Sequence, residues 1–264
     1  MAAGEVTPEW LVDMGQASSA RVYNALLGGK DNFETDREQV RALVPMVPAV
    51  ASWARQNRAF VGRAVAWLAA EAGVRQFLDL GCGITPHDGT KVHEIAQAAL
   101  PGARVVYVDN DPIAVVHGRA YLNGPHSMMV DADLQRPEWV LESPEVQTLI
   151  DVGEPVALLL TSVLHLIRDT AAVWELVDTY VEWLPPGSAL VISHVEATPA
   201  TLEAAELYTA APATPRIHQE IESMFDRVEL LDPGLVPLPL WRPDGAVDDD
   251  AEQVPWLAGV GRKP

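Results

Sequence analysis

The chain has 264 residues, of which 48% are hydrophobic, and its 37 acidic against 18 basic residues give a formal net charge of -19. This length and apolar content suit one large domain, or one domain with an added subdomain, and exclude a chain that is disordered throughout. A protein that grips nucleic acid by its phosphates normally has the opposite charge balance, so we expect no nucleic-acid partner.

Three further features of the sequence concern its compartment. No apolar run reaches the ~18 residues of a membrane-spanning helix. The N-terminus MAAGEVTPEW lacks the basic region and apolar stretch of a secretory signal. The one cysteine, Cys82, permits no disulfide within the chain. We therefore expect a cytoplasmic protein without a membrane partner, and a homo-oligomer is compatible with this composition.

The first 72 residues predict helices and no strand. A tail is followed by three helical segments, the first capped by Ser18 or Ser19, and each is closed by glycine or proline. The longest carries an apolar stripe at spacings of three, four and seven residues, which is typical of one buried face. Residues 1–72 are expected to form an N-terminal helical cap on a core of residues 73–264. The helices are expected at 18–27, 34–44 and 48–73.

From Val74 onward, short apolar runs alternate with helical stretches. This alternation is typical of a parallel, doubly wound sheet with helices on both faces, a Rossmann-like α/β fold. Ligands of such sheets bind outside the carboxyl ends of the strands, where the strand order reverses. Asp111-Pro112, Thr198-Pro199 and Thr214-Pro215 are each expected to start a helix. Strands are expected at 76–80, 104–109, 127–130, 156–161, 189–194, 228–231 and 256–260, and helices at 90–99, 112–122, 137–150, 171–184 and 199–223.

A glycine turn follows the first predicted strand, in the stretch QFLDLGCGITP over residues 76–86. The dinucleotide fingerprint G-x-G-x-x-G fails here because Pro86 stands at its third glycine. The phosphate loop G-x-x-x-x-G-K-[ST] fails because the residues around Gly29-Lys30 do not match it. The acid beside the turn, Asp79, would also repel a phosphate. The turn therefore favours a cationic ligand over a phosphate.

S-adenosylmethionine fits this turn, because it carries an ammonium and a sulfonium. Asp79 is suited to attract the ammonium, directly or through water. Gly81 and Gly83 let the backbone approach the ligand without a Cβ in the way, and Cys82 is a small residue between them.

Two more acids lie at the ends of the next two predicted strands. In VVYVDNDP, Asp109 can accept hydrogen bonds from both ribose hydroxyls. In MMVDADL, Asp133 or Asp131 can accept from the adenine amino group, with Leu134 and Ile113 on either side of the ring. The alternative is that each aspartate merely caps the helix that follows it.

These segments resemble the motifs of class I S-adenosylmethionine-dependent methyltransferases. FLDLGCG, YVDNDP and DADL resemble their first three cofactor motifs, and WLPPGSALVISH the turn and strand after their fourth helix. RVYNALLGGKDNFETDR, ARQNRAF and VHEIAQ resemble an actinobacterial methyltransferase family with no assigned substrate. The resemblance implies a seven-stranded methyltransferase fold with S-adenosylmethionine as cofactor. Cofactor contacts are expected from Asp79, Gly81, Cys82, Gly83, Asp109, Asn110, Asp133, Leu134 and Thr161.

The methyl acceptor is expected at the end of the fourth strand, in LLLTSVLHLIRDT over residues 158–170. This stretch lacks the Asn/Asp-Pro-Pro-aromatic motif of amino-group methyltransferases, and VLHLIRD resembles the histidine-bearing segment of small-molecule O-methyltransferases. His165 then falls on their catalytic histidine, where a neutral imidazole can take a hydroxyl proton. Alternatively, His165 caps the next helix or packs under the pocket. We expect a small-molecule acceptor, with oxygen slightly ahead of nitrogen.

The helical cap is expected to be either a lid over the cofactor pocket or a brace packed on the sheet. Tyr23, Asn57 and Arg58 are candidates for contact with cofactor or substrate. Trp241, in the proline-rich stretch near the C-terminus, is a candidate for lining the pocket.

No metal is expected, because the cluster His87, Asp88, His93 and Glu94 lacks the H-E-x-x-H spacing. The alternative function is a regulatory or scaffolding protein that holds S-adenosylmethionine without turning it over, since cofactor motifs alone do not distinguish the two. A nicotinamide-dependent reductase is a further alternative.

Overall fold

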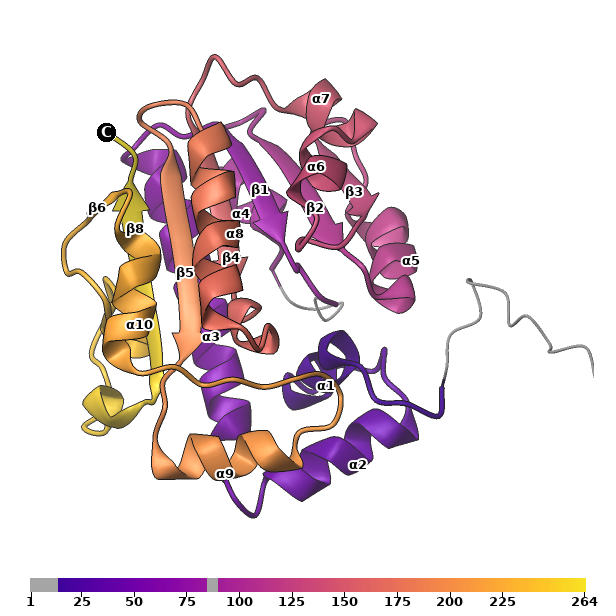
Figure 1. Cartoon of the computed structure of the whole chain (residues 1–264). Helices are drawn as coiled ribbons and strands as arrows, with labels where there is room; N and C mark the ends of the chain where they lie inside the picture. Colours follow the sequence, from indigo (N-terminus) through magenta and orange to yellow (C-terminus); the bar gives the residue numbers. More distant parts are fainter. Residues whose placement is uncertain (1–13, 85–89) are drawn as a thin grey trace, which may run out of the picture.

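The computed structural model describes residues 14–84 and 90–264, which form one mixed sheet flanked by helices (Figure 1). The strands follow the spatial order β3-β2-β1-β4-β5-β8-β6, and β7 pairs with β8 off this path. This is the Rossmann-like α/β architecture that the alternation of strands and helices predicts. The strands are β1 (Gln76–Leu80), β2 (Arg104–Asp109), β3 (Ser127–Asp131), β4 (Val156–Thr161), β5 (Ala189–Val195), β6 (Glu229–Leu230), β7 (Val236–Pro237) and β8 (Trp256–Arg262).

The strand order reverses between β1 and β4. Strands β1 to β5 are parallel, and β8 runs antiparallel to β5. The short strands β6 and β7 both pair with β8, at opposite ends of it. They share one position at the edge of the sheet, so the sheet is of the predicted seven-stranded type although the described residues contain eight strands.

Each face of the sheet has its own apolar core, because successive strand residues point to opposite sides. In β1, Phe77 belongs to one core and Leu78 to the other. β1 is buried along its whole length, which explains its continuous apolar sequence. The helices of the first core are α3 (Val50–Ala70), α4 (Val92–Ala99) and α5 (Pro112–Tyr121), and those of the second are α6 (Pro137–Leu141), α7 (Pro144–Leu149) and α8 (Thr170–Trp183).

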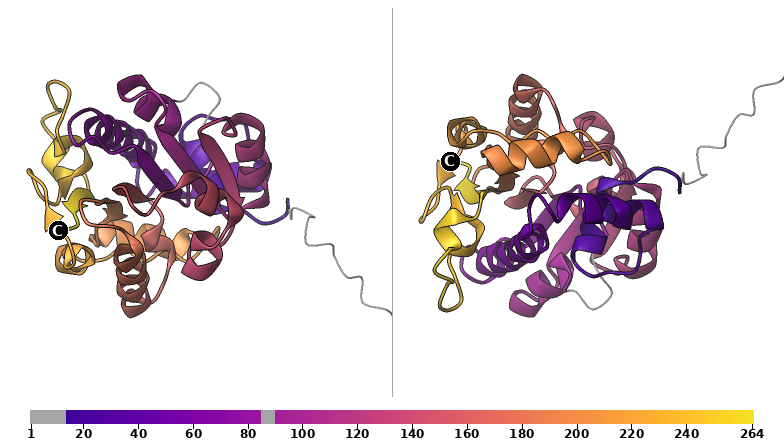
Figure 2. Two further views of the ribbon diagram at one scale, coloured as in Figure 1. Left: turned by 90° about the horizontal axis from the view of Figure 1, so that it is seen from above. Right: turned by 90° about the horizontal axis from the view of Figure 1, so that it is seen from below.

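Three helices lie beyond the carboxyl ends of the parallel strands: α1 (Ser19–Leu26), α2 (Glu34–Leu43) and α9 (Pro199–Leu207) (Figure 1). Seen from below in Figure 2, α9 and the pair α1 and α2 lie across this end of the sheet. Gln39 of α2 joins them, because its amide donates to the carbonyl oxygen of Leu207 at 2.9 Å and accepts from the backbone of Thr209 at 2.9 Å. These helices therefore form a roof over the strand ends.

The long helix α3 lies in a different layer. Its stripe of Phe60, Ala64 and Leu68 is fully buried against the sheet, as the sequence spacing predicts. Within residues 14–72, α1 and α2 are thus the helices that cover the strand ends. No helix of the described residues, including this one of 21 residues, combines the length and the apolarity needed to cross a membrane.

Two predicted helices are each divided in the structure. The stretch 137–150 forms α6 and α7, because Pro144 cannot continue a helix and Ser143 caps the next one. The stretch 199–223 forms α9 and the short α10 (His218–Glu222), separated by a segment without helix or strand over 208–217. The expectation that Thr214-Pro215 starts a helix is wrong.

Candidate functional site

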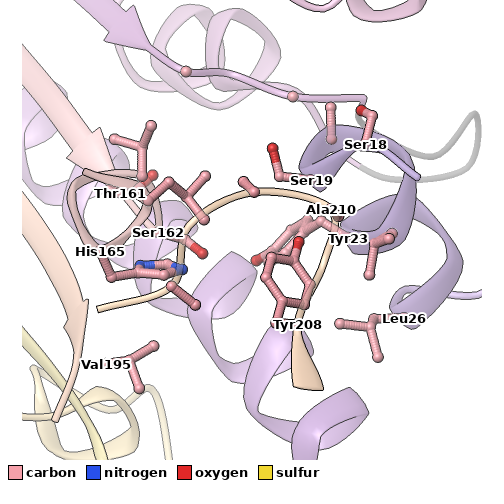
Figure 3. Close-up of a pocket in the computed structure, with 18 of the residues that line it drawn as sticks. Ser18, Ser19, Tyr23, Leu26, Thr161, Ser162, His165, Val195, Tyr208 and Ala210 are labelled. Atoms are coloured by element: carbon pink, nitrogen blue, oxygen red, sulfur yellow. The ribbon is translucent and has the colours of Figure 1, made fainter. Parts of the chain in front are cut away.

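A cavity of about 520 Å³ lies at the carboxyl ends of the parallel strands, under the roof of α1 and α9. Its volume is in the range of ~300–1,000 Å³ that small-molecule pockets occupy. Figure 3 shows Thr161 and His165 on one side of this cavity and Ser19 and Tyr23 of α1 on the other. The cavity therefore lies where the sequence predicts a ligand, at the reversal of the strand order.

The wall of the cavity has two chemically different parts. The carboxylate half comes from the ends of β1, β2 and β3, and it carries Asp79, Asp109, Asp111 and Asp133. Among the described lining residues, the other charged side chain (Asp, Glu, Lys or Arg) is that of Arg58. The apolar half comes from the roof and from the ends of β4 and β5. With His165, it includes Leu26, Leu43, Val195, Ala205 and Tyr208, and Trp53 of α3 adds to it.

The glycine turn after β1 has the backbone that its sequence suggests. Gly81 and Gly83 have φ angles of 68° and 62°, a region that favours glycine. The N–H of Gly81 donates to the carbonyl oxygen of Val108 at 2.8 Å, and the N–H of Gly83 donates to the Asp109 carboxylate at 2.7 Å. A Cβ on Gly81 would lie 2.5 Å from the Val163 side chain, so the turn could not keep this shape with another residue there.

Asp79 and Asp109 are buried carboxylates at the centre of the carboxylate half. Burial raises the pKa of Asp79 to about 6, while Arg58 acts in the opposite direction and Asp109 adds to the rise. Burial also raises the pKa of Asp109 to about 6, although backbone N–H groups of Asp111 and Gly83 lower it. No hydrogen-bond donor among residues 14–84 and 90–264 contacts the Asp79 carboxylate, so this half of the cavity suits a cationic ligand.

The predicted adenine contacts are only partly brought to the cavity. Asp133 and Leu134 line it, whereas Asp131 is exposed and does not. Ile113, expected on the other side of the ring, is not among the residues that line the cavity, and its side chain packs against Ala20 and Ala114. Pro112, the residue before it, lines the cavity instead. The remaining predicted cofactor residues that line it are Gly81, Cys82, Gly83, Asn110 and Thr161.

His165 lies on a single 3₁₀ turn, η1 (Leu164–Leu166), directly after β4. Its Nδ1 is buried and has no hydrogen-bond partner among the described residues. The ring meets the edges of His194 and Trp256, with centroids 5.7 and 5.8 Å away. Burial, followed by the charge of Arg216, lowers the pKa of His165 to about 4. The imidazole is therefore neutral, as expected, but it is a much weaker base than a catalytic histidine that titrates near neutral pH.

Arg216 holds the turn that carries His165, and the sequence analysis does not find it. Its guanidinium, 1% exposed, donates to the carbonyl oxygens of Leu164 at 3.1 Å and Ile167 at 2.7 Å. It also lies 3.0 Å from Nε2 of His194. The irregular segment 208–217 carries it there, and no local pattern marks an arginine whose partners lie far away along the chain.

Ser162 is a second residue that the sequence analysis misses. It lines the cavity at the end of β4 with a φ of 58°, which is uncommon for any residue other than glycine. Its N–H donates to both the carbonyl oxygen and the hydroxyl of Ser193, at 3.1 and 3.0 Å. Backbone strain of this kind is frequent at functional sites.

The candidate cap residues Tyr23, Asn57 and Arg58 all line the cavity. The Asn57 amide donates to the Tyr23 hydroxyl at 2.8 Å, and that hydroxyl donates to the carbonyl oxygen of Ala54 at 3.1 Å. Arg58 donates to the carbonyl oxygen of Thr90 at 3.3 Å. Helices α1 and α3 are therefore joined by side chains at the cavity wall.

Trp241 does not line the cavity, so that prediction is wrong. Its side chain is fully buried, with ring centroids 5.4 Å from Phe60 and 6.5 Å from Trp67. Arg63 of α3 donates to its carbonyl oxygen at 2.9 Å. The proline-rich stretch around it packs on α3, and the apolar ring completes the core there.

The cluster considered for a metal is only partly described. His87 and Asp88 lie outside the described residues. Nδ1 of His93 lies 2.9 Å from the Tyr107 hydroxyl, and Glu94 accepts the N–H of Lys91 at 2.9 Å. Within residues 14–84 and 90–264, no three His, Cys, Asp or Glu side chains are placed to hold a metal ion.

Comparison with known proteins gives matches along nearly the whole chain. A family model described as S-adenosyl methyltransferase matches residues 6–264. A protein from Thermobifida fusca YX, described as a candidate methyltransferase, is 39% identical over 99% of both chains, with a TM-score of 0.90. A DUF574 family protein from Streptomyces avermitilis is 38% identical over 96% of this chain and 99% of its own, with a TM-score of 0.89. No curated protein matches the chain.

More distant structures share the fold alone. Human N-acetylserotonin methyltransferase, solved in complex with S-adenosylmethionine, is 14% identical. The match covers 94% of this chain and 63% of that one, with a TM-score of 0.50.

The site in this structure fits the cofactor of the matching family. The buried Asp79 carboxylate faces a cavity without a donor from the described residues, and the left-handed Gly81 and Gly83 keep side chains out of the turn beside it. A ligand that brings its own ammonium suits this arrangement. The resemblance of the sequence to class I enzymes, and to an actinobacterial family among them, is confirmed by the matches. The chain therefore belongs to the S-adenosyl methyltransferase family and is an S-adenosylmethionine-dependent methyltransferase.

Proposed function

We propose that this enzyme methylates an oxygen atom of a small, largely apolar molecule, which binds in the apolar half of the cavity. The observation that carries the proposal is the position of His165, whose ring lies on the wall of the same cavity as Asp79, Asp109 and Asp133. The volume of about 520 Å³ supports a small molecule rather than a polymer as acceptor. The buried cation Arg216 behind His165 supports oxygen over nitrogen, because an amine acceptor is itself cationic before it loses a proton.

The carboxylate half would hold the cofactor. Asp79 would face its ammonium, Asp109 its ribose hydroxyls, and Asp133 with Leu134 its adenine. Asp109 accepts hydrogen bonds from two backbone N–H groups in the structure, and a carboxylate has ~four acceptor positions, so it retains capacity for the ribose. Bound there, S-adenosylmethionine supplies a methyl group on a positively charged sulfur. Gly81, Cys82, Gly83, Asn110 and Thr161 would complete the contact.

The roof helices α1 and α2 would act as a lid that excludes water from both ligands. Excluding water supports the reaction because a nucleophile is more reactive without its hydration shell, and because the methyl group is protected from hydrolysis. The moving part of the predicted cap over residues 1–72 would be α1 and α2, since α3 is packed into the sheet. Tyr23 and Asn57 would close the cavity between roof and sheet, where they already contact each other.

The test is transfer of labelled methyl groups to a panel of phenols, alcohols and amines, together with calorimetry of S-adenosylhomocysteine binding. We expect binding of S-adenosylhomocysteine and a methyl ether among the products. Methylated amines alone would contradict the assignment of oxygen, and a cofactor that binds without any transfer across a wide panel would contradict an acceptor of this class.

A variant that fills the apolar half of the cavity distinguishes the acceptor site from the cofactor site. Ala205 lines this half on α9, whereas Leu202 on the same helix is half exposed. We expect Ala205→Trp to lower transfer roughly tenfold or more while leaving cofactor affinity within about twofold. Leu202→Trp is the matched control and should leave both quantities unchanged. An equal loss of cofactor affinity in Ala205→Trp would place the acceptor elsewhere.

A further inference from the structure

Arg216 is a buried cation without a carboxylate partner among the described residues. Burial lowers the pKa of Arg216, and the negative charges of Glu220 and Asp169 act in the opposite direction. Neither forms a salt bridge with it, because Glu220 accepts the N–H of Ile217 and Asp169 accepts the N–H groups at the start of α8. A buried charge of this kind is costly unless something nearby compensates it. Arg216 does not itself line the cavity, and its guanidinium donates to the carbonyl oxygens of Leu164 and Ile167. Its charge acts on the ring of His165, which does line it.

The contact with Arg216 also fixes the protonation of His194. A guanidinium is always a donor, so Nε2 of His194 must be the acceptor in their 3.0 Å contact. The proton of His194 is then on Nδ1, from which it is donated to the carbonyl oxygen of Val195 at 2.8 Å. His194 is thus a neutral residue that cannot take a proton from His165 or from an acceptor.

His165 is equally unable to keep a proton taken from the acceptor. A second proton would leave a charged N–H at its buried Nδ1 without an acceptor among the described residues, and Arg216 would repel that charge. Orphaned buried N–H groups are rarer than orphaned acceptors, so the neutral ring should carry its proton on Nε2. Figure 3 shows the other ring nitrogen directed to the cavity, and this is Nε2 because Nδ1 is the buried one.

We propose that the acceptor oxygen is bound as its conjugate base, with Nε2–H of His165 donating a hydrogen bond to it and Arg216 stabilising its negative charge. The proposal rests on the O-methyl transfer proposed above, and it narrows the acceptor class. Acidic hydroxyl groups, those of phenols and enols, can reach this state near neutral pH, whereas aliphatic alcohols cannot. The aliphatic and aromatic wall around His165 accommodates the apolar body of such a molecule.

The methyl transfer then needs no side chain of the protein as a base. The hydroxyl proton of the acceptor leaves to solvent on binding. The acceptor oxygen donates an electron pair to the methyl carbon, so that an O–C bond forms while the S–C bond breaks with its electron pair on sulfur. An anion and a sulfonium become a neutral ether and a neutral thioether, and a weakly polar cavity favours this loss of charge.

The two tyrosines that line the cavity do not act as a base for the acceptor hydroxyl. Tyr23 of α1 and Tyr208 at the end of α9 stay protonated, because burial raises the pKa of each. Both residues line the cavity, and the Tyr23 hydroxyl already donates to the carbonyl oxygen of Ala54. The aspartates of the carboxylate half, with Arg58, lie on the cofactor side of the cavity. Arg216 is the cation whose charge acts on His165.

A chromophoric acceptor tests the proposal directly. The phenolate of 4-nitrophenol absorbs visible light and its phenol does not, so its absorbance reports the bound form in the complex with S-adenosylhomocysteine. We expect the pKa of the bound probe to fall by at least about one unit in the wild-type enzyme, and the shift to be largely lost in Arg216→Met. An unchanged or raised pKa would overturn the proposal. So would failure of 4-nitrophenol and 4-nitro-1-naphthol to bind while S-adenosylhomocysteine binds.

Nitrogen NMR of the histidine rings gives a readout that needs no substrate and no variant that must fold. In the complex with S-adenosylhomocysteine, we expect His165 to be the neutral Nε2–H tautomer and His194 the neutral Nδ1–H tautomer from about pH 8 to about pH 5. A His165 that titrates near neutral pH, or that carries its proton on Nδ1, would overturn the proposal. Loss of S-adenosylhomocysteine binding itself would instead contradict the proposed function.

Two variants of His165 distinguish a donor from a base. Glutamine keeps an N–H donor near the position of Nε2 but cannot accept a proton, and leucine does neither. With an accepted phenol as substrate, we expect His165→Gln to retain roughly a tenth or more of wild-type turnover and His165→Leu to lose about a hundredfold. Equal losses in the two variants, together with an enzyme titration near neutral pH in the wild type, would establish a general base and refute a donor.

Discussion

The Ser193 hydroxyl donates a 2.6 Å hydrogen bond to the side-chain oxygen of Asn57, across 136 positions of the sequence. The side-chain amide of Asn57 donates to the Tyr23 hydroxyl at 2.8 Å. The hydroxyl oxygen of Ser193 accepts a hydrogen bond from the N–H of Ser162 at 3.0 Å. One chain of hydrogen bonds thus links α1, α3, β5 and the end of β4. It joins the roof of the cavity to the strand ends that form its floor.

Replacing Asn57 by leucine should destabilise the protein, because it leaves the buried hydroxyl of Ser193 without its acceptor. We expect the free energy of unfolding to fall by about 1–3 kcal/mol, measured by urea denaturation. Gln56→Leu on the same helix is the control, since Oε1 of Gln56 is buried without a partner among the described residues and its removal should cost little. Equal stability of Asn57→Leu and the wild type would show that the contact contributes nothing.

Cofactor affinity should depend on pH through Asp79. Burial raises the pKa of Asp79 to about 6, so its carboxyl loses its charge as the pH falls through 6. The charged form is the one that attracts an ammonium, and Asp109, whose pKa burial likewise raises to about 6, adds to the effect. We expect the Kd of S-adenosylhomocysteine, measured by calorimetry, to be nearly constant above pH 7 and to rise about tenfold or more from pH 6 to pH 5.

The Asp79→Asn variant checks the origin of this pH dependence. At pH 7.5 it should bind S-adenosylhomocysteine more weakly by about 1.5–3 kcal/mol, the range for a hydrogen bond to a charged group, and its affinity should vary less with pH. Asp131→Asn is the matched control, because Asp131 is exposed and lies outside the cavity wall. An Asp79→Asn enzyme with wild-type affinity would mean that the ammonium lies elsewhere.

The two glycines of the turn should differ in their tolerance of alanine. Both have positive φ angles, but a Cβ on Gly83 meets no atom within 4 Å, whereas one on Gly81 meets Val163 at 2.5 Å. We expect Gly83→Ala to cost about 1–2 kcal/mol of stability through its backbone alone. Gly81→Ala should cost roughly 1–3 kcal/mol more by overpacking. Thermal denaturation measures both, and Val163→Ala should rescue part of the Gly81→Ala loss. An equal cost for the two alanines would refute the steric account.

The strained backbone of Ser162 predicts opposite effects on stability and activity. Ser162→Gly removes the cost of a left-handed non-glycine residue and should raise the free energy of unfolding by about 1 kcal/mol. If the Ser162 side chain contacts the acceptor, the same variant should transfer methyl groups more slowly. Ser162→Ala keeps the strain and loses only the hydroxyl, so it should be slower without being more stable. If Ser162→Ala were stabilised as much as Ser162→Gly, the gain in stability would not come from relief of the backbone strain.

The fold class and the cofactor could both be predicted from sequence patterns. The bounds of β1, β2 and β4 agree with the expected ones, because apolar runs between helical stretches specify buried parallel strands. Asp79, Asp109 and Asp133 could be placed together without coordinates, since the carboxyl ends of parallel strands meet at one edge of the sheet. Sequence spacing is therefore enough to predict neighbouring residues wherever the topology of the sheet alone brings them together.

The contacts around His165 and Asn57 depend on tertiary packing that the sequence pattern does not reveal. Arg216 and His194 meet, and Asn57 meets Ser193, through packing of segments whose separation no periodicity encodes. The same packing buried Trp241 in the core, where the sequence suggested a pocket. The pKa of His165 is likewise a property of its surroundings, because burial and Arg216 lower it to about 4. Solvation and long-range contacts are set when the chain folds, and they decide whether His165 can hold a second proton.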